Sequence, residues 1–178
     1  MELQRQSQID FESILCVGAR IFDQWADIID CKHCRTNPPS LVVLTTAAER
    51  MLILYTAACE AYGLAGGMEE GTGTAGAGLN ARFHGSLDAA QTSSEQVVCV
   101  HSGMKLGELA LEGEDAKLLA RVLLSRNLVK FGALLEDQNV LASCGSDMTN
   151  QNSVLGACEA SIAETMEKLT ILAGLIRI

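Results

Sequence analysis

Residues 104–135, which read MKLGELALEGEDAKLLARVLLSRNLVKFGALL, decide the fold class of this chain. A short lead-in of mixed polar and apolar residues (105–109) comes before an acidic run at 112–115. Acidic side chains favour a first helical turn because they interact with the positive end of the helix dipole. Leucine and valine then recur over several turns. The stretch therefore predicts a long helix from near Gly113 to near Ala142.

Three further segments show apolar residues at helical spacing. The first covers residues 7–30, where Ser7 is the expected cap. The second covers residues 40–62 and follows a turn at 36–40, in which Asn37 or Ser40 can cap the helix and the prolines suit its first turn. It is apolar on nearly every face, so we expect it to be central or to supply an interface. The last begins between Thr149 and Ser153 and ends at Ile176.

A glycine-rich stretch, residues 63–103, separates the second and third predicted helices. It contains seven glycines between Gly63 and Gly78, followed by many Ser, Thr, Ala and Gln residues. Such a length is far beyond the usual connection between elements, so we expect a linker or loop, with short helical pieces between residues 88 and 100. The sequence thus predicts a single all-α domain over residues 1–178. Its architecture is a bundle of four main helices with one long crossover loop.

Composition and charge limit the classes of function. Apolar residues make up 48% of the chain and aromatic ones only 4%, which favours a folded helical protein. The 13 basic and 22 acidic residues give a net charge of -9, and this sign disfavours direct binding to nucleic acid. No apolar signal segment follows Met1. The apolar run at 41–59 is interrupted by Glu49 and Arg50, so we expect no membrane span and an intracellular protein.

Cys31 and Cys34 form a CxxC pair at the end of the first predicted helix. Two thiolates at this spacing can share a tetrahedral metal, but a structural zinc site needs four ligands and the chain has no second such pair. A redox disulfide is another reading. The favoured interpretation is that both are small apolar residues packed under the second helix. We therefore expect neither a metal site nor a cofactor.

The large amphipathic aromatic residues and two histidines are the candidate ligand-binding residues. Trp25, Tyr55 and Tyr62 combine an apolar body with a polar tip, which suits a pocket between the first two helices, although core packing is the simpler reading. His84 and His101 lie in or near the long loop, where they can cover such a pocket. The sequence contains none of the common hydrolase, metalloprotease or nucleotide-binding motifs. The catalytic residues, if any, are not identified.

The order of these elements resembles a known family. The CxxC turn, CKHCRTNPPSL at 31–41, the apolar second helix, the glycine-rich insert and the KLG lead-in before EGED together resemble the C-terminal regulatory domain of fungal zinc-cluster transcription factors of the aflatoxin-regulator type. This chain lacks the six-cysteine DNA-binding cluster of those proteins. The resemblance implies an all-α regulatory domain connected with fungal secondary metabolism. It also implies a nuclear location, or a cytoplasmic one if the chain is a stand-alone relative.

Two functions follow from these observations. In the first, the chain is a regulatory, dimerisation or ligand-sensing domain that binds a protein partner or a second copy through the apolar faces of its second and third helices. In the second, it is a stand-alone pathway protein that binds an apolar metabolite. Such a protein can catalyse a cyclisation, rearrangement or isomerisation without a cofactor, since shape, desolvation and one or two polar groups are sufficient.

Overall fold

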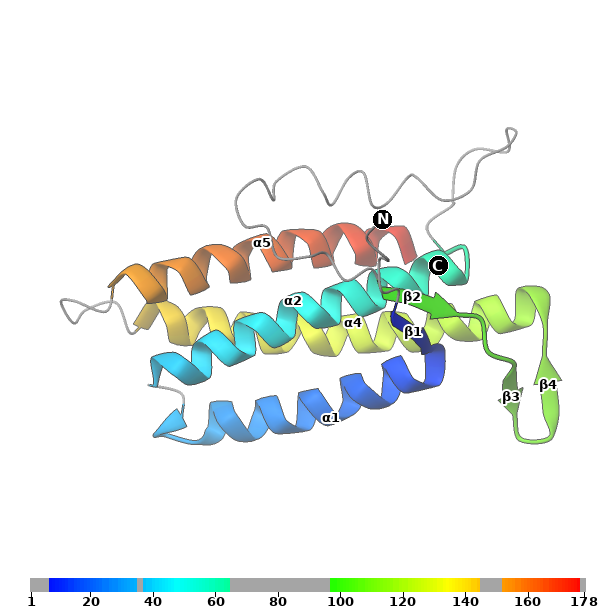
Figure 1. The fold of residues 1–178 in the computed structure, drawn as a ribbon, viewed down its shortest axis with the longest axis horizontal. Helices are drawn as coiled ribbons and strands as arrows, with labels where there is room; N and C mark the ends of the chain where they lie inside the picture. Colours follow the sequence, from blue (N-terminus) through cyan, green and yellow to red (C-terminus); the bar gives the residue numbers. More distant parts are fainter. Residues whose placement is uncertain (1–6, 35–36, 65–96, 145–151, 177–178) are drawn as a thin grey trace, which may run out of the picture.

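Four long helices dominate the computed structural model, which describes residues 7–34, 37–64, 97–144 and 152–176 (Figure 1). They are α1 (Phe11–Asp30), α2 (Pro38–Ala61), α4 (Gly113–Cys144) and α5 (Asn152–Ile176). The all-α prediction is confirmed, and each predicted helix boundary lies within a few residues of the observed one.

The N-terminal end of α1 differs from the prediction. Residues 7–10 form a short strand, β1 (Ser7–Asp10), so Ser7 is not the cap. Asp10 caps the helix instead: its carboxylate accepts hydrogen bonds from the backbone N–H of Ser13 (2.8 Å) and from the Ser13 hydroxyl (2.7 Å). These bonds hold the pKa of Asp10 below its ordinary value. The carboxylate satisfies a backbone donor that the first turn leaves unpaired, and this determines where the helix begins.

A strand occupies part of the segment predicted as a loop, and two more follow that segment. β2 (Val97–Val100) pairs in parallel with β1, so the prediction of helical pieces reaching Val100 is wrong for these residues. β3 (Met104–Leu106) and β4 (Leu109–Leu111) form an antiparallel hairpin at one end of the bundle (Figure 1). Gly107 has φ +63°, a conformation that glycine adopts without steric cost, and so permits the tight turn. The remainder of the predicted glycine-rich loop, 65–96, lies outside the described residues.

The centre of the bundle is filled by aromatic side chains. Phe131 of α4 is fully buried, and its ring centroid lies 6.1 Å from that of Trp25 and 6.2 Å from that of Tyr55. Phe22 lies at a similar distance, 6.0 Å. Gly18 allows α1 and α2 to approach closely, since a Cβ at this position would lie 2.5 Å from the Tyr55 hydroxyl. We call Trp25, Tyr55, Phe131 and Phe22 the aromatic centre.

Helix α2 contacts each of the other three helices, as its apolar sequence predicted. It is long and apolar enough to span a membrane by composition. However, 56% of its most apolar window is buried inside the bundle. A central core helix accounts for the same composition.

α4 and α5 pack most extensively against each other, and α5 also covers α2.

Candidate functional site

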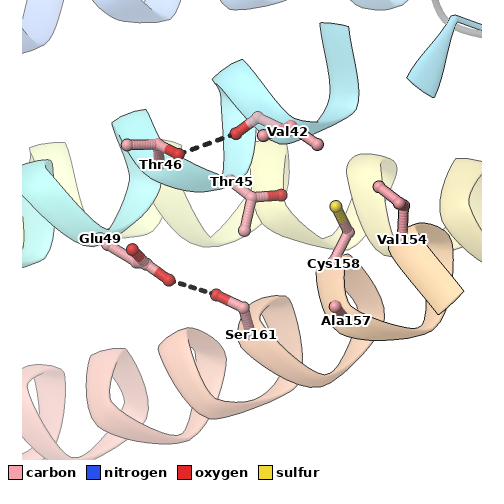
Figure 2. A pocket seen from close by; sticks show the side chains of 8 residues that line it. All are labelled: Val42, Thr45, Thr46, Glu49, Val154, Ala157, Cys158 and Ser161. Atoms are coloured by element: carbon pink, nitrogen blue, oxygen red, sulfur yellow. Dashed lines mark hydrogen bonds between the residues drawn. The ribbon is translucent and has the colours of Figure 1, made fainter. Parts of the chain in front are cut away.

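A shallow groove of about 310 Å³ lies between the first halves of α2 and α5 (Figure 2). Four residues of each helix line it: Val42, Thr45, Thr46 and Glu49, and Val154, Ala157, Cys158 and Ser161. Both sets follow the same spacing, i, i+3, i+4 and i+7, which places each set on one helical face. The groove exists because most of these side chains are small, so two long helices pack side by side without filling the space between them.

The wall and floor of the groove differ in burial. Thr45 and Cys158 are buried and form the floor, whereas Val42 and Val154 are exposed at the rim. The lining is mainly apolar carbon, as in most small-molecule sites. The volume of the groove is at the lower end of the usual range for such sites, about 300–1,000 Å³. A small molecule that lies here would contact apolar side chains on both helices.

The polar atoms of the groove are mostly hydrogen-bond acceptors. The Thr45 and Thr46 hydroxyls donate to backbone oxygens of their own helix, to Leu41 at 2.8 Å and to Val42 at 3.0 Å. Their donors are therefore occupied, while the Thr46 oxygen retains a free lone pair. The Ser161 hydroxyl of α5 donates to the Glu49 carboxylate of α2, which bridges the two helices (Figure 2). Glu49 has further lone pairs available, so the groove favours a ligand that donates a hydrogen bond.

Gln138 of α4 supports the groove floor from inside the bundle. It is fully buried, and its side-chain amide donates to the Thr45 oxygen (3.0 Å) and to the Leu41 carbonyl (3.3 Å). These bonds connect α4 with the first turns of α2 and hold Thr45 in place. The Gln138 side-chain oxygen has no hydrogen-bond partner among the described residues.

Trp25 and Tyr55, predicted to bind ligand, lie in the aromatic centre and do not line the groove. The Trp25 indole nitrogen and the Tyr55 hydroxyl are buried without a hydrogen-bond partner in the described part of the chain. Burial raises the pKa of the Tyr55 hydroxyl well above its ordinary value. Both side chains fill the core, and their role in ligand binding stays a prediction.

Tyr62 and His101 form a separate pair near the hairpin end of the bundle. Their ring centroids are 4.2 Å apart, and the Tyr62 ring also packs 4.9 Å from that of Phe11. The Tyr62 hydroxyl donates to the Ser102 carbonyl (3.2 Å), and burial raises the Tyr62 pKa. The structure therefore brings two of the predicted residues together, away from the groove. His84 lies outside the described residues.

The CxxC pair lies at the turn after α1. Cys31 and Cys34 are half-buried there, and their packing as small apolar residues under α2 stays a prediction. Hydrogen bonds from the backbone and thiol of Cys34 lower the pKa of Cys31, and the bond to Cys31 raises the pKa of Cys34. Over the described ranges, no three His, Cys, Asp or Glu side chains gather closely enough to hold a metal ion.

Comparison with known proteins gives one informative similarity. No family model matches the sequence, and no solved structure matches it. The chain is 32% identical over 129 residues to the asperlin biosynthesis cluster protein I of Emericella nidulans. The similar region covers 67% of this chain and 56% of that protein, so the chain spans about half the length of its relative. This similarity agrees with the predicted link to fungal secondary metabolism, whereas it does not bear on transcription regulation.

The groove residues were not among the sequence-based candidates, although a signal was present. The two sets of small residues at identical helical spacing, one on each of two apolar helices, mark faces that cannot fill the space between them. What the sequence does not show is that these two faces are opposite each other.

Proposed function

We propose that this protein takes part in fungal secondary-metabolite biosynthesis by binding a small, mainly apolar molecule in the groove between α2 and α5. The observation that carries the proposal is the groove itself, with apolar walls from two helices and acceptor oxygens at Thr46 and Glu49. The similarity to a protein named for a biosynthesis cluster supports the metabolic context.

The acceptor oxygens suggest which ligands bind best. A molecule with an apolar skeleton and one hydroxyl group would bury its carbon atoms against Val42 and Val154, and its hydroxyl would donate a hydrogen bond to the Glu49 carboxylate. An otherwise similar molecule without a donor would leave the carboxylate partly desolvated and unpaired, which costs free energy. The proposed ligand class is therefore an apolar molecule that carries a hydroxyl group.

Methyl NMR with labelled valine and alanine tests this proposal, with 1-octanol and its methyl ether as probes. We expect 1-octanol to shift the methyl signals of Val42, Val154 and Ala157 in a saturable way. The ether should bind about fivefold more weakly, the equivalent of one net hydrogen bond of about 1 kcal/mol. Unchanged groove signals with both probes would refute the proposal.

A matched pair of variants separates the groove from the rest of α5. Ala157→Leu places a larger side chain in the groove and should abolish the octanol response. Ala163→Leu makes the same change at an exposed position of α5 outside the lining and should leave the response intact. Equal loss in both variants would show that the response does not come from the groove.

Catalysis in the same groove is a second proposal, supported by Glu49. Glu49 is the carboxylate among the described lining residues, and it lies beside apolar walls where a substrate proton can be accepted. Glu49→Gln keeps the shape of the side chain but removes the base. An enzyme should lose turnover of its substrate and keep binding, whereas a pure binding protein should show only a change in affinity.

A further inference from the structure

The outer face of α4 carries a stripe of exposed apolar residues. Its residues, which we call the outer stripe, are Leu118 (53% exposed), Val122 (46%), Val129 (74%) and Val140 (61%). The neighbouring Ala133 is also exposed. The buried side of the same helix faces α1, α2 and α5, so the outer stripe is not a part of the bundle core.

The spacing of the outer stripe keeps it straight along α4. Leu118, Val129 and Val140 are each 11 residues apart, and an 11-residue repeat stays close to one line on an α-helix of 3.6 residues per turn. At a rise of about 1.5 Å per residue, the stripe is about 33 Å long. A straight apolar line of this length has the form of a helix-packing surface.

The charges beside the stripe show what can pack on it. Arg126 is exposed in the middle of α4, and Glu136 is exposed ten residues later, near the C-terminal end. A second α4 in parallel orientation and equal register would place like charges against each other. In an antiparallel pair centred near residue 131, Arg126 of each copy lies opposite Glu136 of the other.

The same register also matches the apolar residues. In this antiparallel pair, residues equally far from position 131 on either side lie opposite each other. Positions 122 and 140 form such a pair, as do positions 129 and 133. Val122 of one copy therefore packs against Val140 of the other, and Val129 packs against Ala133. The acidic first turn at Glu114 and Asp115 falls beyond the part of α4 that overlaps, so it does not repel the second copy.

We infer that the partner of the outer stripe is a second copy of this chain, packed antiparallel through α4 with reciprocal Arg126–Glu136 ion pairs. Such a two-fold contact is self-complementary, since each residue pair occurs twice. It uses a different surface from the groove between α2 and α5. The two proposals can therefore fail independently.

Sedimentation velocity of the full chain over a range of concentrations tests this inference. We expect a concentration-dependent dimer that weakens at high salt, as exposed ion pairs do. Val129→Glu should give a monomer. Because Val129 is highly exposed, this variant should keep the wild-type circular dichroism, and it should keep the wild-type melting curve at concentrations low enough for the wild type to be monomeric. Val43→Glu is the matched control, since Val43 is 63% exposed on α2 and should leave the dimer unchanged.

Charge exchange tests the register. Arg126→Glu and Glu136→Arg alone should each raise the dissociation constant of the dimer about tenfold, because each breaks two symmetric ion pairs and creates two repulsive ones. The double variant should return to within about twofold of the wild type. A monomeric wild type, or a double variant as weak as the single ones, would overturn the inference.

Discussion

The aromatic centre and the groove between α2 and α5 lie in the same bundle but differ in how their side chains use space. The aromatic centre joins α1, α2 and α4 through large rings whose fully buried members leave the interior filled. The groove lies between α2 and α5 and, apart from Glu49, is lined by Val, Thr, Ala, Cys and Ser, whose short side chains leave a shallow depression. Small residues, not the aromatic ones, therefore create the candidate site.

The comparison also separates polar atoms enclosed in the core from polar atoms that a ligand can reach. The Trp25 nitrogen and the Tyr55 hydroxyl are enclosed among core side chains, where they cost stability unless a partner is present. Glu49 and Thr46 face the groove, where water or a ligand can reach their lone pairs. A polar atom supports ligand binding only where a molecule has room to reach it.

The largest effect should come from the aromatic centre. Phe131→Ala removes the ring that contacts Trp25, Tyr55 and Phe22, and should lower the free energy of unfolding by about 3–5 kcal/mol. Urea denaturation followed by circular dichroism measures this. Val129→Ala, on the exposed side of α4, should change stability by less than about 0.5 kcal/mol. Similar effects in the two variants would contradict the assignment of Phe131 to a filled core.

A second prediction concerns the close approach of α1 and α2. Gly18→Ala should destabilise the protein by about 1–3 kcal/mol, because its Cβ would overlap the Tyr55 hydroxyl. In a Tyr55→Phe background the overlap with the hydroxyl disappears, and the nearest remaining atom is the Met51 Cε at 3.1 Å, the end of a flexible side chain that can move. The same change should therefore cost less, and the better helix propensity of alanine offsets part of that cost. A double-mutant cycle measured by urea denaturation gives the coupling. No coupling between the two positions would argue against this contact.

Gln138 lies where the two regions meet and should give a smaller effect. Gln138→Leu removes two hydrogen bonds, but Thr45 and Leu41 still bond to each other, and an unpartnered buried oxygen disappears. We expect a change of less than about 1 kcal/mol in unfolding free energy. A loss above about 2 kcal/mol would mean that the Gln138 oxygen has a partner that matters for stability.

The last prediction concerns the reactivity of one cysteine thiol in the core and one in the groove. Burial, followed by the charges of Glu60 and Cys99, raises the pKa of Cys59 to about 12, so this core thiol has almost no thiolate at pH 8. Cys158 lines the groove. Iodoacetamide should therefore label Cys158 before Cys59, as peptide mass spectrometry can show, and a shift from pH 7 to pH 9 should not reverse the order. Faster labelling of Cys59 would contradict the comparison.

Part of this structure was predictable from local patterns. The apolar spacing and the acidic run at 112–115 located α4, and α2 was recognised as central because it is apolar on nearly every face. The start of α1 was misplaced by a few residues because Ser7 and Asp10 are both good caps, and only the parallel pairing with β2 makes Ser7 part of a strand. That pairing joins residues about 90 positions apart, which no local pattern reveals.

By itself, the sequence determined the four long helices, since helical periodicity and capping depend on neighbours a few residues away. It also determined the acidic charge and the apolar character of α2. Tertiary structure alone decided which faces meet: that Trp25 and Tyr55 are enclosed, that Cys31 and Cys34 are half-buried, and that two rows of mostly small residues face each other across α2 and α5. The physical reason is that a groove depends on the space between two helices, and that space is set by how all four pack together.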